Sequence, residues 1–154
     1  MGAANATTES TSGTQDVSDA AAVRRTALDY VEGWYEANGE RMGRALHPDL
    51  AKRIVRKDPK SGKDYLDTTM SAKLLVQWTW EGGGCLNSSW DSRPNCIKTP
   101  KDSQRKDITI FDIFENQASA KVEFFEWLDY LHLAKLDGKW VIVNVLWQMK
   151  PHAR

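Results

Sequence analysis

With 154 residues, the chain has the length of one ordinary domain and can bury a core without help from a metal or a disulfide. Its 21 basic and 21 acidic residues cancel, which argues against a nucleic-acid-binding surface and gives no attraction to an anionic membrane. No apolar run approaches the roughly 20 residues of a membrane helix, and the N-terminus lacks the pattern of a signal peptide, so we expect a cytoplasmic protein.

The first predicted elements are a polar tail over residues 1–15 and a helix after it. Asp16 and Ser18 can cap the helix, because their side-chain oxygens accept bonds from free backbone N–H groups. Asn38-Gly39 is expected to end it. The apolar residues recur at steps of three and four, which places them on one face: Val23, Ala27, Tyr30, Val31, Trp34 and Tyr35.

A second, short helix and a hairpin are predicted next. Residues 40–46 suit a helix that ends before His47-Pro48, since a proline disfavours the helical state of the residue before it. A strand over 49–57 then meets the turn residues 58–62, and the chain returns as a short strand at Tyr65-Leu66.

A third helix passes through Trp78 and ends at the glycines 82–84, where a Gly-, Ser- and Pro-rich loop over 82–104 begins. A loop of this length in a small domain is usually functional or disordered. Cys85 and Cys96 flank it. A disulfide between them would hold the loop closed, whereas two free thiols are the ordinary state in a cytosolic protein, and the sequence leaves both open.

The C-terminal third changes to a two-residue period, which indicates strands. We predict strands over 108–113, 118–128 and 129–136, and the hairpin turn Asp137-Gly138 leads into a last strand over 139–149. Helices followed by an antiparallel meander define an α+β class.

The block 129–144, DYLHLAKLDGKWVIVN, resembles the closing hairpin of the nuclear-transport-factor-2-like superfamily, in its SnoaL-like or "putative lumazine-binding" branch. The segment 27–35, ALDYVEGWY, and the residues Leu46-His47-Pro48 resemble the first helices of the same family. The resemblance implies one domain over residues 16–150, a cone-shaped barrel in which a strongly curved antiparallel sheet wraps around about three helices. It also implies a cavity, and homodimers are common in such proteins.

The last strand departs from the family at Val141 and Val145, where lysines are frequent. One side of this strand is therefore apolar throughout, and an apolar outer row suits a dimer interface better than a solvated face. We predict a homodimer through that row: Val141, Val143, Val145, Trp147 and Met149.

Alternation assigns the opposite, concave row to Trp140, Asn144 and Gln148, among others. Asn144 can bond a ligand carbonyl or satisfy backbone groups, and both readings stay open. Gln148 would add a second polar point, and Trp140 an aromatic wall.

Asp129 is the first candidate catalytic residue. A carboxylate enclosed by apolar side chains can exchange protons near neutral pH, as the aspartates of isomerases in this superfamily do. Its alternative role is structural, at the bend of the strand. His47 is a candidate proton shuttle, or a histidine that bonds a helix end.

Tyr30 and Trp34 are candidate ligand-contacting residues of the first helix, with core packing as the alternative. The three histidines and two cysteines show no metal-ligand spacing, so we expect neither metal nor redox cofactor. The leading hypothesis is a small-molecule enzyme of acid–base type, an isomerase, cyclase or dehydratase acting on an apolar or polycyclic metabolite. A non-catalytic binding module and a dimeric interaction domain are the alternatives.

Overall fold

The computed structural model describes residues 12–151. Its elements are α1 (Ser12–Tyr35), α2 (Gly39–Ala45), β1 (Leu46–Lys57), β2 (Asp64–Met70), α3 (Ala72–Gly82), the short 3₁₀ helices η1 (Asn87–Ser92) and η2 (Lys101–Ser103), β3 (Asp107–Phe114), β4 (Gln117–Glu123), β5 (Trp127–Leu136) and β6 (Lys139–Met149). Of the predicted tail, residues 1–11 lie outside the described range, and α1 already contains residues 12–15. Within residues 12–151, no helix is long and apolar enough to cross a membrane.

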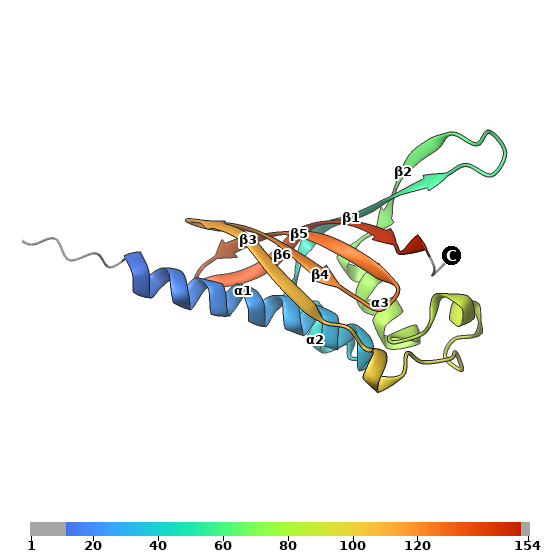
Figure 1. Cartoon of the computed structure of the whole chain (residues 1–154), viewed down its shortest axis with the longest axis horizontal. Helices are drawn as coiled ribbons and strands as arrows, with labels where there is room; N and C mark the ends of the chain where they lie inside the picture. Colours follow the sequence, from blue (N-terminus) through green and yellow to red (C-terminus); the bar gives the residue numbers. More distant parts are fainter. Residues whose placement is uncertain (1–11, 152–154) are drawn as a thin grey trace, which may run out of the picture.

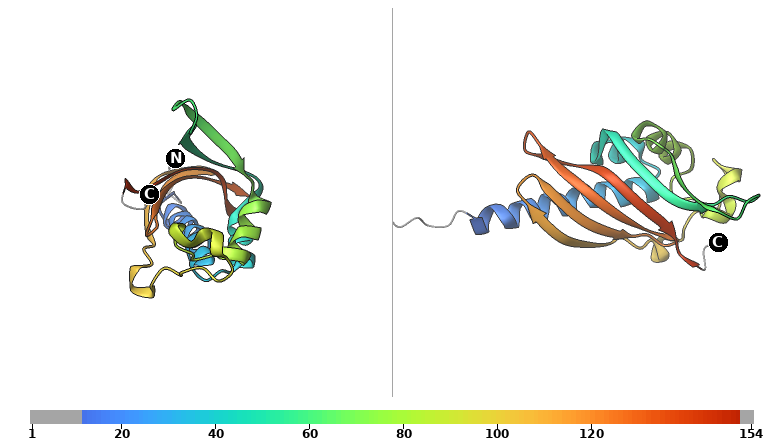
Figure 2. Two further views of the ribbon diagram at one scale, coloured as in Figure 1. Left: turned by 90° about the vertical axis from the view of Figure 1, so that its right-hand side faces the viewer. Right: turned by 90° about the horizontal axis from the view of Figure 1, so that it is seen from above.

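The strands form one sheet in the order β2-β1-β6-β5-β4-β3. Figure 2 shows the sheet arching over the helices, and Figure 1 shows α1 lying along its concave side while the β1–β2 hairpin projects beyond the body. The predicted α+β class with a curved sheet around helices is confirmed. The sheet stays open, and β1 runs parallel to β6. No hairpin joins these two strands, so nothing in the local chain forces them to be antiparallel.

The apolar face predicted for the first helix is buried, as all six of its members lie in the core. The helix ends at Tyr35, before the predicted stop at Asn38-Gly39. Ala37 takes a positive φ of 52°, which turns the chain. Asn38 instead caps α2, because its side-chain oxygen accepts a bond of 2.9 Å from the backbone N–H of Arg41.

Two local irregularities in the sheet depart from the prediction. The strand predicted over 118–128 is broken by a bend at residues 124–126, where the Phe124 N–H donates to the Trp127 carbonyl at 2.9 Å. A bulge lies in β6, because Leu133 pairs with Ile142 and His132 with Asn144, which leaves Val143 as an extra residue. Beyond a bulge, each side chain faces the side opposite to that expected from simple alternation.

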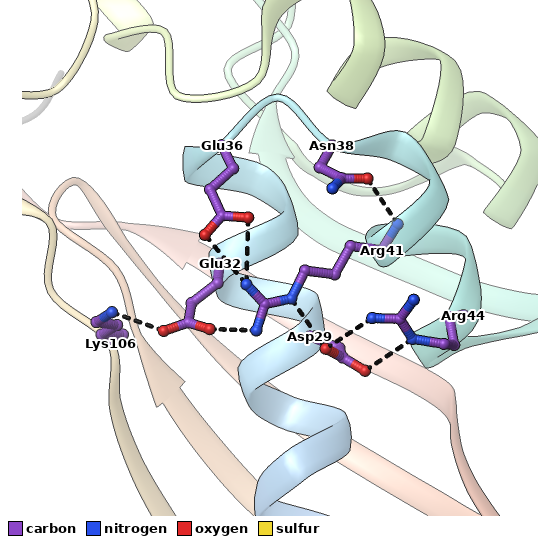
Figure 3. Close-up of polar contacts among 7 residues, drawn as sticks. All are labelled: Asp29, Glu32, Glu36, Asn38, Arg41, Arg44 and Lys106. Atoms are coloured by element: carbon purple, nitrogen blue, oxygen red, sulfur yellow. Dashed lines mark hydrogen bonds and ion pairs between the residues drawn. The ribbon is translucent and has the colours of Figure 1, made fainter.

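Arg41 joins α1 to α2 through a cluster of charged side chains (Figure 3). Its guanidinium donates to Asp29 at 2.9 Å, to Glu36 at 3.1 Å and also to Glu32. Lys106, just before β3, adds an ion pair of 2.6 Å with Glu32. The cluster therefore ties the helical layer to the start of the far edge strand.

Replacing this guanidinium, as in Arg41→Gln, is expected to lower the free energy of unfolding by about 1–2 kcal/mol, because three carboxylates lose a shared donor that is only 23% exposed. Urea denaturation measures the loss. Arg44→Gln is the matched control and should cost clearly less, since Arg44 is 53% exposed and, among residues 12–151, bonds Asp29 alone.

The same comparison should depend on pH. Hydrogen bonds from Lys106 and Arg41 lower the pKa of Glu32 below 4.5 despite partial burial. Burial alone would raise the pKa of Asp29, but the arginines lower it below 3.8 overall. Carboxyl groups with lowered pKa values stabilise the fold above their unfolded pKa and lose this contribution as pH falls through the folded value. The difference between wild type and Arg41→Gln should therefore shrink below about pH 4, and a difference that grows there would contradict this account.

Candidate functional site

An aromatic cavity of about 200 Å³ lies between the sheet and the helices, at the end of the sheet where β6 finishes. Every layer of the fold contributes to it. The lining residues are Tyr30 and Trp34 of α1, Met42 of α2, Lys52 and Arg56 of β1, Met70 of β2, Leu75 and Trp78 of α3, Cys85, Asn87 and Trp90 of the following loop, Phe124, Trp127 of β5, and Trp147 and Met149 of β6.

The aromatic rings of the wall contact one another in a continuous chain. Trp34 stacks on Trp90 with ring centroids 5.7 Å apart and meets Trp127 edge-on at 5.6 Å. Phe124 stacks on Trp127 at 4.8 Å. Rings that pack in this way hold a rigid apolar surface suited to a planar ligand.

A buried polar cluster of Tyr30, Lys52 and Asp129 forms one part of the wall. The Tyr30 hydroxyl donates to Asp129 Oδ2 at 2.5 Å. The Lys52 ammonium donates to the same oxygen at 2.8 Å and to the Tyr30 oxygen at 2.6 Å. Tyr30 and Lys52 line the cavity, whereas Asp129 is fully buried behind them.

The surroundings change the acidity of two of these groups. Burial, and then the charge of Asp129 and its hydrogen bond, raises the pKa of Tyr30 well above 10.0, so Tyr30 keeps its proton. Burial lowers the pKa of Lys52 below 10.5, although the charge of Asp129 opposes this shift. The Lys52 amine can therefore release a proton more readily than an exposed lysine, while Tyr30 keeps its proton, donates to Asp129 and accepts from Lys52.

A loop closed by the disulfide Cys85–Cys96 covers one side of the cavity. It carries Trp90, which packs on Trp34. Glu126 fixes the start of η1, since its carboxylate accepts a bond of 2.8 Å from the Asn87 N–H. Burial raises the pKa of Glu126, and that hydrogen bond opposes the shift. Of the two alternatives that the sequence left open, the structure has the disulfide.

Three of the predicted site residues meet at this cavity. Tyr30 and Trp34 line it, and Asp129 is hydrogen-bonded to Tyr30. Their proximity follows from α1 lying across the concave side of β5.

The other four predicted site residues lie elsewhere. Asn144 and Gln148 are exposed on the outer side, because the bulge at Val143 reverses the alternation of β6. Trp140 is buried in the core, away from the cavity lining, with its indole N–H bonded to Asp19 at 3.0 Å. His47 also lies outside the lining, and its Nδ1 accepts a bond from the Asp49 N–H at 3.1 Å.

The same bulge corrects the predicted outer row of the last strand. Trp147 and Met149 line the cavity, and Val145, which also follows the bulge, is only 2% exposed. Val141 precedes the bulge and is 7% exposed, and the bulged Val143 is half-buried on the outer side, beside Asn144 and His132. This row is therefore mostly an inner wall.

Lys52 is a candidate site residue that the sequence analysis did not predict. A signal for it was present, since Leu50, Lys52 and Ile54 occupy alternate positions of β1 and all three are buried. A lysine that interrupts an apolar alternation needs a buried partner. Its partner, Asp129, lies far away in the sequence, so pattern alone does not connect them.

Comparison with known proteins gives a family match and several structural relatives. Residues 18–148 match the model of the family described as "putative lumazine-binding". No curated protein sequence matches significantly. A nuclear-transport-factor-2-like protein of unknown function from Shewanella baltica is similar in structure, with a TM-score of 0.61, 18% identity, and coverage of 88% of this chain and 96% of that one.

Two similar structures bear the names of enzymes. A hexachlorocyclohexane dehydrochlorinase from Novosphingobium barchaimii has a TM-score of 0.58 and 10% identity, with 90% of this chain and 91% of that one covered. A "putative scytalone dehydratase" from Novosphingobium aromaticivorans has a TM-score of 0.52 and 10% identity, with 89% and 87% covered. At such identities the likeness extends to the fold alone.

Proposed function

Because the chain belongs to the family described as "putative lumazine-binding", within the nuclear-transport-factor-2-like superfamily, we propose that it is a small-molecule enzyme of acid–base type. The observation that best supports this proposal is the buried cluster of Tyr30, Lys52 and Asp129 in the wall of an aromatic cavity. Isomerisation, cyclisation and dehydration all need a proton removed at one atom and delivered at another. The dehydratase and dehydrochlorinase names of two structural relatives are in keeping with such chemistry.

Each residue of the cluster has a separate role in this proposal. The Lys52 amine, once it has given its proton to solvent, takes a proton from the substrate and becomes an ammonium. The Asp129 carboxylate, 2.8 Å away, stabilises that ammonium until the proton is delivered to the product. Tyr30 stays protonated and holds both partners in place. These transfers require no redox cofactor.

The cavity volume bears on the size of the substrate. An enclosed space of about 150 Å³ is enough for benzene, so about 200 Å³ suits a single substituted ring. We therefore propose that the part of the substrate held in the cavity is a single ring, in place of the polycyclic substrate expected from the sequence.

Acetophenone is a suitable probe, because it has one ring and an acidic methyl group beside a carbonyl. In D₂O, the protein should accelerate deuterium uptake at that methyl group above the rate in buffer, measured by NMR. A rate equal to that of free lysine at the same concentration would refute the enzyme proposal.

A non-catalytic binding module is the second candidate, favoured by the complete burial of Asp129. It predicts that acetophenone binds without any exchange. Native mass spectrometry of freshly purified protein would then show a co-purifying small molecule, whose removal changes tryptophan fluorescence.

We also propose a homodimer through the outer sheet face, at residues other than the predicted row. Phe111, Tyr130 and Leu146 are more than half exposed there, and the rings of Phe111 and Tyr130 stack 6.3 Å apart. The double substitution Tyr130→Lys/Leu146→Lys should give a monomer in sedimentation velocity. Ile97→Lys, at a 63% exposed loop position, should leave the dimer intact. A wild-type monomer at high concentration would contradict the proposal.

The proposed compartment also changes with the structure. Cytosolic thiols are normally kept reduced, so the disulfide Cys85–Cys96 favours an oxidising compartment over the cytoplasmic one expected from the sequence.

A further inference from the structure

Arg56 brings a guanidinium into the cavity lining from β1, close to the end of that strand at Lys57. The hairpin that carries it projects beyond the body of the protein (Figure 1). The Arg56 side chain is 45% exposed, whereas that of Lys52, four residues earlier, is only 5% exposed. The cavity therefore has one cation at its buried end and a second cation on the side that solvent reaches.

The guanidinium of Arg56 is held in one orientation by Asp67 of β2. Its Nε donates to Asp67 Oδ2 at 2.9 Å, and Asp67 Oδ1 accepts from the backbone N–H and the hydroxyl of Thr69, at 3.0 Å and 2.8 Å. The ring centroid of Trp147 lies 6.0 Å from the central guanidinium carbon. Within residues 12–151, the two terminal nitrogens bond no other residue. The fork with which an arginine grips a carboxylate through two parallel hydrogen bonds is therefore positioned and free.

The two carboxylates that pair with these cations present no free oxygen to the cavity. Asp67 has both oxygens bonded, one by Arg56 and the other by Thr69. Asp129 is fully buried behind Lys52, and its Oδ1, which has no hydrogen-bond partner, has no accessible surface. Among the lining residues that the structure describes there is no other Asp or Glu. An anionic group that enters the cavity can therefore bond Arg56, whereas a cationic group meets no available carboxylate.

A smaller hollow adjoins the aromatic cavity beside Arg56 and has a volume of about 50 Å³. The two spaces share part of their lining, namely Lys52, Arg56, Met70, Trp78 and Trp147. Since benzene needs roughly 150 Å³ and one water molecule takes roughly 30 Å³, the hollow is too small for a ring and suits a group of a few atoms. A ring in the cavity and a small polar group in the hollow would occupy both spaces.

We propose that the site binds a single ring that carries a carboxylate, with the ring in the aromatic cavity and the carboxylate on the terminal nitrogens of Arg56. Lys52 and Arg56 lie on one side of β1 with about 13 Å between their Cα atoms, so groups at opposite ends of the ring face both side chains. The carbon that loses a proton then lies beside Lys52. The inference rests on the proposed function for this role of Lys52 alone, because Arg56 binds the carboxylate whether or not a reaction follows.

4-Acetylbenzoate and 4-acetylbenzamide test the carboxylate. Both have the acetyl group of acetophenone at one end of the ring and the same number of non-hydrogen atoms, but only the benzoate is an anion. In calorimetric titrations, the protein should bind the benzoate about 10-fold more tightly than the benzamide, the factor expected for a charged, hydrogen-bonded pair that is partly exposed. This preference should decrease at high salt, because salt screens a partly exposed ion pair.

Arg56→Gln removes the fork and should bring the two affinities within about 2-fold of each other. Arg53→Gln is the matched control, because Arg53 is an exposed arginine of the same strand that lies outside the cavity lining. It should keep the preference for the benzoate. Urea denaturation checks that Arg56→Gln remains folded, and the comparison of the two probes in the wild-type protein does not depend on any variant.

Several outcomes would overturn the inference: equal affinity of the wild-type protein for the two probes, tighter binding of the benzamide, no binding of either at millimolar concentration, or an unchanged preference in a folded Arg56→Gln protein. Deuterium uptake tests the enzyme proposal separately. Selective binding of the benzoate without exchange at its methyl group would uphold the ligand class and refute the enzyme. Exchange of acetophenone by a protein that does not prefer the benzoate would do the reverse.

Discussion

Replacing Asp129 by Asn is expected to lower the free energy of unfolding by about 3–5 kcal/mol at pH 7. The amide keeps an oxygen to accept from Tyr30 but removes the charge that compensates Lys52, which is only 5% exposed. The ammonium must then stay unpaired or lose its proton. Removing this proton at pH 7 costs about 5 kcal/mol for a lysine with the ordinary pKa of 10.5. The loss of folding free energy in the variant therefore cannot exceed about that amount.

The pH dependence of that loss follows from the lowered pKa of Lys52. A folded pKa below the unfolded value means that the folded state binds fewer protons, so the penalty is present at neutral pH and disappears as pH rises toward 10.5. The variant should therefore approach wild-type stability in urea denaturation at high pH. The double variant Lys52→Met/Asp129→Asn removes both charges and should recover most of the loss.

Asp112→Asn is the control for the amide itself, since Asp112 is exposed on β3 and should tolerate the change. A loss below about 1 kcal/mol for Asp129→Asn, or no recovery in the double variant, would show that Lys52 and Asp129 are not a charged pair.

Replacing Lys52 by Met is expected to reduce deuterium uptake by acetophenone about 10²- to 10⁴-fold, the range typical for loss of a general base. Met keeps much of the length of the lysine stem but has no basic nitrogen. In the wild type, the rate should rise with pH and level off below 10.5, because only the neutral amine accepts a proton. The Lys52→Met variant should lack this rise of the exchange rate with pH.

Lys60→Met, at an exposed position in the β1–β2 turn, is the matched control and should exchange acetophenone at the wild-type rate. Urea denaturation of Lys52→Met separates lost chemistry from lost fold. An unchanged exchange rate in a folded Lys52→Met protein would remove Lys52 from the mechanism and leave the binding module as the better account.

Sequence reasoning reached the fold because its signals are local. The buried face of α1 follows from a period near 3.6, and the hairpin of β5 and β6 follows from alternation around Asp137-Gly138, where Asp137 has the positive φ that such turns require. The family resemblance then supplied the arrangement of sheet and helices, which no local pattern specifies.

The predicted sides of β6 were wrong because one extra residue changes the register of this strand. The bulge at Val143 carries no Gly or Pro to mark it, yet it exchanges the two sides of β6 for every later residue. Asn144 and Gln148 thereby moved outward, and Trp147 and Met149 moved into the cavity wall.

The sequence by itself determined the α+β class, the core face of α1, and Tyr30, Trp34 and Asp129 as candidate site residues. Only the tertiary structure decided what Asp129 does, because it brings Lys52, 77 positions earlier in the chain, within 2.8 Å of the carboxylate. It likewise decided which tryptophans surround the cavity. The curvature of the sheet over α1 and the register of β1 against β6 determine which residues meet at the cavity. Both depend on contacts between segments that are distant in the sequence, and a local sequence pattern does not predict such contacts.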